Sequence, residues 1–160
     1  LIWEKWCSYL TAKTFGYIRV LFTRLSQLGN VNFLLAAILH DICKPDSVEI
    51  NPRTGNIMTP RHDFLGARLM DNDKDIQAWI SSHGGDFDIV HCIVKQHIRV
   101  KGIDKMRQFK RDELYFMNVT INGRDIQMWN KLKVFTMADT MIVDFDLDKA
   151  EKLLIYDKWI

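Results

Sequence analysis

Hydrophobic and polar residues follow each other along this chain in patterns that predict mostly helices. Residues 3–28 place apolar side chains near helical spacing and predict one helix or two, ended by Gly29. Residues 33–39 are seven consecutive apolar residues, and a segment that is apolar on every side is typical of a helix inside a core. His40 and Asp41 follow directly, so we expect both in a largely water-free place where each needs a partner.

Four more helices are predicted further along the chain. Thr59 and Pro60 form a good helix start, as N-cap and first helical residue. The predicted segments are a helix from Thr59 to about Met70, a short amphipathic helix at Ile76–Ile80, a helix from about Phe87 to Val100, and a helix from about Arg124 to Val143.

One small β-hairpin is predicted among these helices. Residues 47–50 and 56–58 are short alternating runs around a turn-rich centre at residues 51–55. A plain connector is one role for this hairpin, and a lid that carries Arg53 toward a phosphate is the alternative. Residues 101–123 show no clear period, and we expect a loop over the site that ends in a turn.

The fold prediction is an all-α bundle of five to seven helices packed around the His40–Asp41 helix, with one small hairpin, as a single domain over residues 1–160. The composition agrees with an ordinary folded protein, because 48% of residues are hydrophobic and 26% are charged. No apolar run approaches the ~20 residues that a membrane-spanning helix needs. A cytoplasmic location is expected, since Cys7, Cys43 and Cys92 lack the spacing of a disulfide framework or a zinc site.

Several polar residues fall on the apolar faces of the predicted helices. A metal ion suits His40 and Asp41 together, because imidazole nitrogen and carboxylate oxygen are ligands of Zn, Mn, Fe and Ni. His62 and Asp139 also face inward on their helices. An inward carboxylate is rarely left alone, so Asp139 is expected either to bind a metal or to form a buried salt bridge with a lysine or arginine.

Four motifs in order resemble the HD-domain superfamily of metal-dependent phosphohydrolases. They read LLAAILHDICKP, HDFLGARLM, IVKQHI and MADT, and the resemblance covers roughly residues 31–145. The likeness is greatest to the HD modules found beside tRNA nucleotidyltransferases and in nucleic-acid end-repair enzymes. It implies a helical metal-dependent hydrolase of phosphate esters.

The resemblance also implies roles for individual residues. His40, Asp41 and Asp139 would surround one divalent ion (Mn, Ni, Co, Fe, Zn or Mg), with His62 and His97 on a second ion or on the substrate phosphate. Lys44 would contact a phosphate oxygen and, with Asp41 and His62, serve catalysis. The substrate-binding set would then be Lys44, Arg53, His62 and His97, whereas His91 is expected to be structural and His83 to have no role.

Two departures from the family pattern stand out. The first helix of the family carries a histidine ligand, and this chain has no histidine before His40. Either the ligand lies before residue 1, another group replaces it, or the site is altered. Cys43 stands where the family has glycine, which would shape the turn before Lys44 differently.

The implied reaction is hydrolysis of a nucleotide or RNA-terminal phosphate, such as a 2′,3′-cyclic phosphate or a 2′- or 3′-phosphate. A free-nucleotide 5′-phosphohydrolase is one alternative, and an HD-like module that binds a nucleotide without turnover is another. A net charge of +2 is too small to indicate a nucleic-acid partner, but residues 95–111 are locally basic and form either a solvated face or a polyanion-facing patch. The oligomeric state stays open.

Overall fold

The computed structural model describes residues 30–143 of the chain. The helix or helices predicted at residues 3–28 lie outside this range. By its internal contacts the chain divides into two compact units, Leu1–Asn30 and Val31–Ile160. All elements named below belong to the second unit, apart from the first residue of α3.

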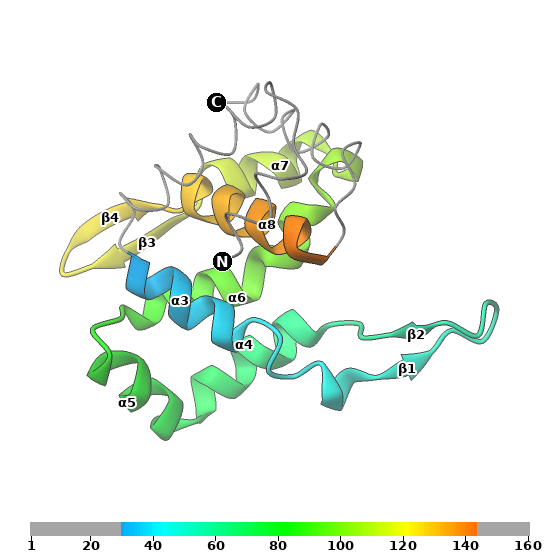
Figure 1. Ribbon diagram of the computed structural model, residues 1–160. Coiled ribbons are helices and arrows are strands. Elements are labelled where there is room, and N and C mark those ends of the chain that lie inside the picture. The colour runs from blue at the N-terminus through cyan, green and yellow to red at the C-terminus, as the bar shows by residue number, and fades with distance from the viewer. Residues whose placement is uncertain (1–29, 144–160) are drawn as a thin grey trace, which may run out of the picture. The chain divides into compact units, whose positions relative to one another are not determined.

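The described residues are mostly helical, as predicted, and contain six α-helices (Figure 1). Two short 3₁₀ turns, η1 (Pro45–Ser47) and η2 (Ile103–Lys105), separate some of them. The helices are α3 (Asn30–Leu39), α4 (His62–Asn72), α5 (Lys74–Ser82), α6 (Phe87–Lys101), α7 (Gln108–Tyr115) and α8 (Trp129–Val143). None of these helices has both the length and the apolar character that crossing a membrane requires.

Two antiparallel hairpins extend from the helices to opposite sides in Figure 1. The predicted hairpin is confirmed, with β1 (Glu49–Ile50) paired to β2 (Ile57–Met58) in the register Glu49 to Met58. The second hairpin, β3 (Asn118–Ile121) with β4 (Arg124–Gln127), was not predicted.

The second hairpin also corrects the predicted start of the last helix. Asn122 and Gly123 both adopt left-handed backbone, with φ of 51° and 74°. Two such residues in succession form the tight turn that matches the twist of paired strands. Residues after this turn therefore pair as a strand, and α8 begins at Trp129 rather than near Arg124.

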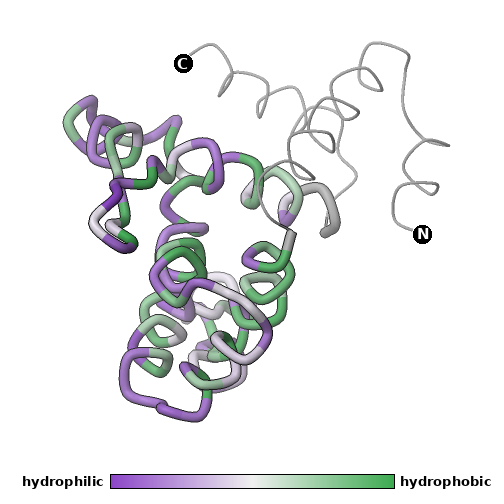
Figure 2. Tube along the Cα trace, turned by 90° about the vertical axis from the view of Figure 1, so that its left-hand side faces the viewer, coloured by the Kyte–Doolittle hydropathy of each residue, from purple (hydrophilic) through white to green (hydrophobic). Residues whose placement is uncertain are grey.

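Helix α6 is the centre of the packing, because α4 and α8 both pack against it. Its side chains Val90, Ile93 and Val94 have no exposed surface. Gly66 allows α4 to approach closely, since a Cβ atom at that position would lie 3.3 Å from Val94 Cγ1. In Figure 2 hydrophobic and hydrophilic stretches alternate along the trace, as expected for helices that bury one face.

The expectation that α3 is buried on every side is wrong. Leu34 and Ile38 are each 63% exposed, whereas Leu35, one residue further on, is 4% exposed. Within the described part of the chain, α3 packs through the face that carries Phe33, which stacks on Phe135 of α8 at 6.3 Å between ring centroids. An apolar run therefore predicted the helix correctly but not how many of its faces are covered.

Helix α4 begins at His62, and the predicted N-cap role of Thr59 is wrong. The residue before the helix, Arg61, has left-handed backbone with φ of 61°, which a non-glycine residue adopts only at a cost. This conformation breaks the helical path that Thr59 and Pro60 would otherwise begin. Helix α5 is as predicted, and Asp73 caps it by accepting hydrogen bonds from the amides of Asp75 and Ile76.

Candidate metal centre

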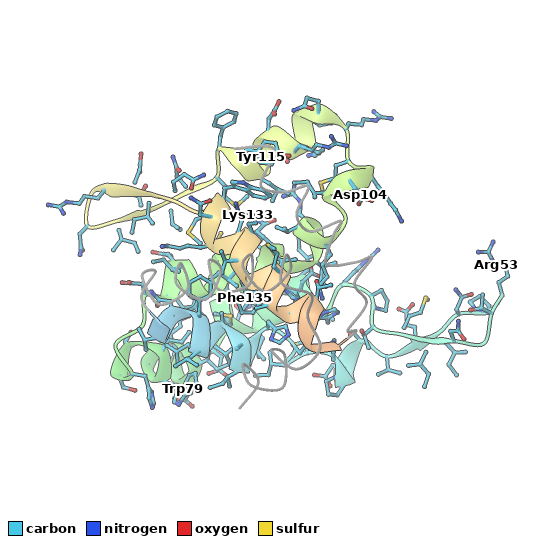
Figure 3. All side chains as sticks on the ribbon, turned by 45° about the horizontal axis from the view of Figure 1, so that its top comes forward. Arg53, Trp79, Asp104, Tyr115, Lys133 and Phe135 are labelled. Atoms are coloured by element: carbon cyan, nitrogen blue, oxygen red, sulfur yellow. The ribbon has the colours of Figure 1, made fainter. Side chains whose placement is uncertain are left out.

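The five side chains that the resemblance assigns to metal binding lie together in the structure, although they come from four separate helical segments. His40 and Asp41 follow the end of α3, His62 opens α4, His97 lies in the last turns of α6, and Asp139 lies near the end of α8. The ring of His97 has its centroid 5.2 Å from that of His40 and 5.5 Å from that of His62. Phe135, at the middle of Figure 3, contacts the rings of His40 and His97 edge-on.

The three histidines of this cluster are oriented in the same way. In each, Nδ1 lies within hydrogen-bond distance of a backbone carbonyl three residues earlier. The distances are 2.9 Å from His40 to Ala37, 2.7 Å from His62 to Thr59, and 2.7 Å from His97 to Val94. A carbonyl can only accept, so each Nδ1 carries the proton and donates it. In His62 and His97 the Nε2 atom is then the free nitrogen, which is how metal-binding histidines are commonly held, whereas Nε2 of His40 faces Asp41 and Asp139.

Three atoms of the cluster face one another without a hydrogen bond. They are Asp41 Oδ1, His62 Nε2 and His97 Nε2, all buried and all within 4.8 Å of one another. We call these three residues the candidate triad. Their atoms offer lone pairs only, so they repel one another unless a cation lies between them. Burial lowers the pKa of His97 to about 4, so this imidazole is neutral near pH 7 and supplies no proton to relieve the conflict.

The remaining two predicted ligands are already paired. Asp139 contacts His40 Nε2 through Oδ1 at 3.4 Å and Lys101 Nζ through Oδ2 at 2.5 Å. We call His40, Lys101 and Asp139 the paired group. Burial alone would raise the pKa of Asp139, but the hydrogen bonds from His40 and Lys101 hold the pKa of this carboxyl well below its usual range. Burial lowers the pKa of His40, but Asp139 and Asp41 raise it by more, so the pKa lies above its ordinary value.

Asp41 lies between the two sets. Its Oδ1 is 3.3 Å from His62 Nε2, and its Oδ2 is 3.1 Å from His40 Nε2 and 2.6 Å from Lys44 Nζ. The prediction placed His40, Asp41 and Asp139 around the first ion. His40 Nε2 does lie close to both carboxylates, but the ligand atoms that all lie within 4.8 Å of one another belong to Asp41, His62 and His97, and Asp139 forms the salt bridge that the sequence left as its alternative role.

The candidate triad fits a divalent ion of the transition series. Two imidazole nitrogens and one carboxylate oxygen are the donors that Zn, Mn, Fe, Co and Ni sites use, and three protein ligands leave positions open for water or substrate. Mg²⁺ fits less well, because it prefers oxygen donors and keeps much of its water. A divalent ion held by these three residues would therefore account for their buried, unpaired lone pairs.

Other residues singled out in the sequence lie away from the triad. Arg53 is exposed in the turn of the β1–β2 hairpin and points away from the helices in Figure 3, so nothing brings it to the site. His91 lies 3.1 Å from Asp71 and packs against the ring of Phe87. His83 is exposed and hydrogen-bonds within its own turn. Lys44, in contrast, does contact the site, because its Nζ lies 2.6 Å from Asp41 Oδ2.

Two features of the site were not predicted. Lys101 stands four residues after His97 on α6, and that spacing, which places two residues on one helix face, was the available signal. The left-handed Arg61, which directly precedes His62, has no sequence signal because the residue is not glycine, asparagine or aspartate.

The basic stretch at residues 95–111 is largely engaged within the protein. Arg99 and Lys110 both contact Glu113, and Lys101 contacts Asp139. Arg111 donates to the carbonyls of Ile103 and Asp104. These pairings agree better with a solvated face, in which several charges are paired within the protein, than with a polyanion-facing patch.

Comparison of the chain with protein-family models, with characterised proteins and with solved structures finds no match. The geometry of the cluster is therefore the basis for a functional assignment.

Proposed function

We propose that this protein is a metal-dependent phosphohydrolase that acts on nucleotide or RNA-terminal phosphates. The observation that supports this proposal is the candidate triad, in which three buried lone-pair atoms of Asp41, His62 and His97 meet without a hydrogen bond. A divalent ion bound there would lower the pKa of a water ligand toward neutrality and offset charge on a phosphoryl oxygen. The resemblance of the four sequence motifs to HD-domain phosphohydrolases points the same way.

The side chains around the triad suit a phosphate ester. Lys44 and Lys101 each place an ammonium group beside a carboxylate of the cluster and remain 44% and 35% exposed at their side chains. They can therefore meet a substrate from the solvent side while staying fixed by Asp41 and Asp139. Phe135 and the buried ring of His97 form an apolar wall on the protein side, which limits water behind the reacting group.

The substrate class follows from the resemblance more than from the geometry. A 2′,3′-cyclic phosphate or a terminal 2′- or 3′-phosphate is the first choice, and a free 5′-nucleotide is the alternative. The pairing of Arg99, Lys101 and Lys110 with acidic residues reduces the positive charge that a long polyanion would meet near α6. Nucleotides and short RNA ends are accordingly better substrates to test than long duplexes.

The test is phosphate release or ring opening from 2′,3′-cyclic, 3′- and 5′-nucleotides and from end-labelled RNA. Each substrate is assayed with Mn²⁺, Co²⁺, Ni²⁺ or Mg²⁺, beside a chelated control. Turnover of one substrate class that stops on chelation is the expected result. Stoichiometric metal binding without turnover of any substrate would contradict the proposed enzymatic activity. The alternative, a module that binds a nucleotide without turnover, would then be favoured.

A further inference from the structure

Two lysines lie beside the carboxylates of the cluster. Besides Asp41, the cluster contains four side chains that can bind a metal. They are His40, His62, His97 and Asp139, and with Asp41 as a bridge they would be enough ligands for two ions. Yet the two carboxylates of the cluster each carry a lysine, Lys44 on Asp41 and Lys101 on Asp139. Among the described residues, no further carboxylate contacts His40, His62 or His97.

The net charge of the cluster depends on these two lysines. With neutral histidines, the charges of the two carboxylates and the two ammonium groups sum to zero. One bound dication then gives the cluster a net charge of +2. A second dication about 4 Å from the first would double that charge in a mostly buried place, where repulsion between ions is weakly screened. Sites with two dications need additional carboxylates, and the described residues offer none here.

Lys101 is fixed at the position where the second ion would bind. It lies one helical turn after His97 on α6, and its ammonium is 2.5 Å from Asp139 Oδ2. Asp139 Oδ1 in turn lies 3.4 Å from His40 Nε2. A second ion bound to His40 and Asp139 would therefore have to displace Lys101 or lie directly beside its charge.

We propose that Lys101 takes the place of a second metal ion, neutralises Asp139 and keeps the cluster a one-ion site. This inference rests on the proposed metal site at Asp41, His62 and His97. With an ion held by the triad, the ammonium of Lys101 would then supply a second positive charge for a substrate phosphate, from its place beside Asp139.

The test is the stoichiometry of Co²⁺ or Zn²⁺ bound to the full chain, measured by titration calorimetry and by metal analysis after gel filtration. The wild-type chain should bind one ion, and Lys101→Met should bind two, because His40 and Asp139 become available. Lys105→Met, an exposed lysine in η2, is the matched control and should bind one. Lys101→Arg keeps the charge and should also bind one.

The outcomes separate the inference from the proposed function. Two ions on the wild-type chain, or one ion on folded Lys101→Met, would overturn the role of Lys101 and leave the metal site intact. Absence of any bound ion on the wild-type chain would contradict both the role of Lys101 and the proposed metal site. If Lys101→Met does not fold, Asp139→Asn in the wild-type background decides, because loss of the single ion in that variant would show that Asp139 binds it and that Lys101 does not replace a metal.

Discussion

The two halves of the cluster differ in how their buried polar atoms are satisfied. In the paired group, His40 and Lys101 both contact Asp139, and Asp139 Oδ2, which has no hydrogen bond among the described residues, lies against the Lys101 ammonium, so its charge has a partner of opposite sign. In the candidate triad, the facing atoms of Asp41, His62 and His97 have no hydrogen-bond partner among residues 30–143. Since unpaired buried polar groups cost free energy, the triad is the half that requires a ligand and the paired group is the half that is complete without one.

The contrast extends to the backbone that holds each half. His40 continues the path of α3, with its amide bonded to the Ala36 carbonyl at 2.8 Å. His62 instead follows Arg61, whose left-handed conformation is strained for a non-glycine residue. Strain and facing lone pairs thus occur together in the triad, whereas the buried Asp139 Oδ2 of the paired group, although it also lacks a hydrogen bond among the described residues, lies against the ammonium of Lys101. Such a combination is typical of a functional site rather than of a structural ion pair.

The largest effect is expected from Asp41→Asn, because Asp41 is a member of the triad and also contacts His40 of the paired group. An asparagine cannot supply the anionic oxygen, so both metal binding and metal-dependent phosphate release should be abolished. Metal titration and the phosphate assay check this result. Asp46→Asn, an exposed residue in η1, is the control and should behave as wild type. An Asp41→Asn variant that still binds one ion would show that the triad is not the metal site.

The next variants compare the two halves directly. His97→Gln should abolish metal binding, because it removes a triad ligand whose ring is fully buried. His40→Gln should leave the ion bound and lower phosphate release by roughly 10–100-fold, as for residues that support a metal site without binding the ion. Both are measured by metal titration and by the same assay. Loss of the ion in His40→Gln, with retention in His97→Gln, would reverse the assignment of the halves.

The sequence predicted the members of the cluster better than their arrangement. Apolar helix faces and the four motifs placed His40, Asp41, His62, His97 and Asp139 near one another, and the structure brings them together. Which of them share an ion depends on side-chain distances of a few ångströms, and helical periodicity does not resolve these. The pairing of Asp139 with Lys101 crosses from α8 to α6, so it required the helix packing as well as the sequence.

The two mispredicted features have different causes. The second hairpin was missed because residues 101–123 were expected to form a loop, although Asn122 and Gly123 are favourable for a tight turn, so its signal lay in the local sequence. The exposure of Leu34 and Ile38 was missed because an apolar run does not show how many neighbours a helix has. That exposure depends on tertiary contacts, which a local pattern does not reveal.

A smaller effect is expected from Gly66→Ala, which tests how closely the triad depends on the packing of α4 against α6. The added Cβ would lie 3.3 Å from Val94 Cγ1, a tight approach, so Val94 or the two helices must shift by a few tenths of an ångström near His62 and His97. We expect the free energy of unfolding to fall by about 1–3 kcal/mol, as for other overpacked cores, and metal affinity to weaken.

Denaturant unfolding and metal titration check this prediction. Gly102→Ala is its control, because a Cβ there meets only the Arg99 carbonyl at 3.8 Å, an ordinary contact distance. Weaker metal binding by Gly102→Ala as well would show that the change does not act through the approach of α4 to α6.

The smallest effect is expected from Arg61→Gly, which removes the strain before His62. Glycine adopts φ of 61° without the clash that a Cβ causes, but it also gains freedom in the unfolded chain. The first effect should prevail, so we expect the free energy of unfolding to rise by up to about 1 kcal/mol, with the metal site unchanged. Arg68→Gly is the matched control, because Arg68 lies in the regular interior of α4, where glycine should cost about 1 kcal/mol. Denaturant unfolding of both variants separates the two cases. Equal destabilisation by both changes would show that Arg61 is not strained, and the triad would then differ from the paired group only in its unsatisfied atoms.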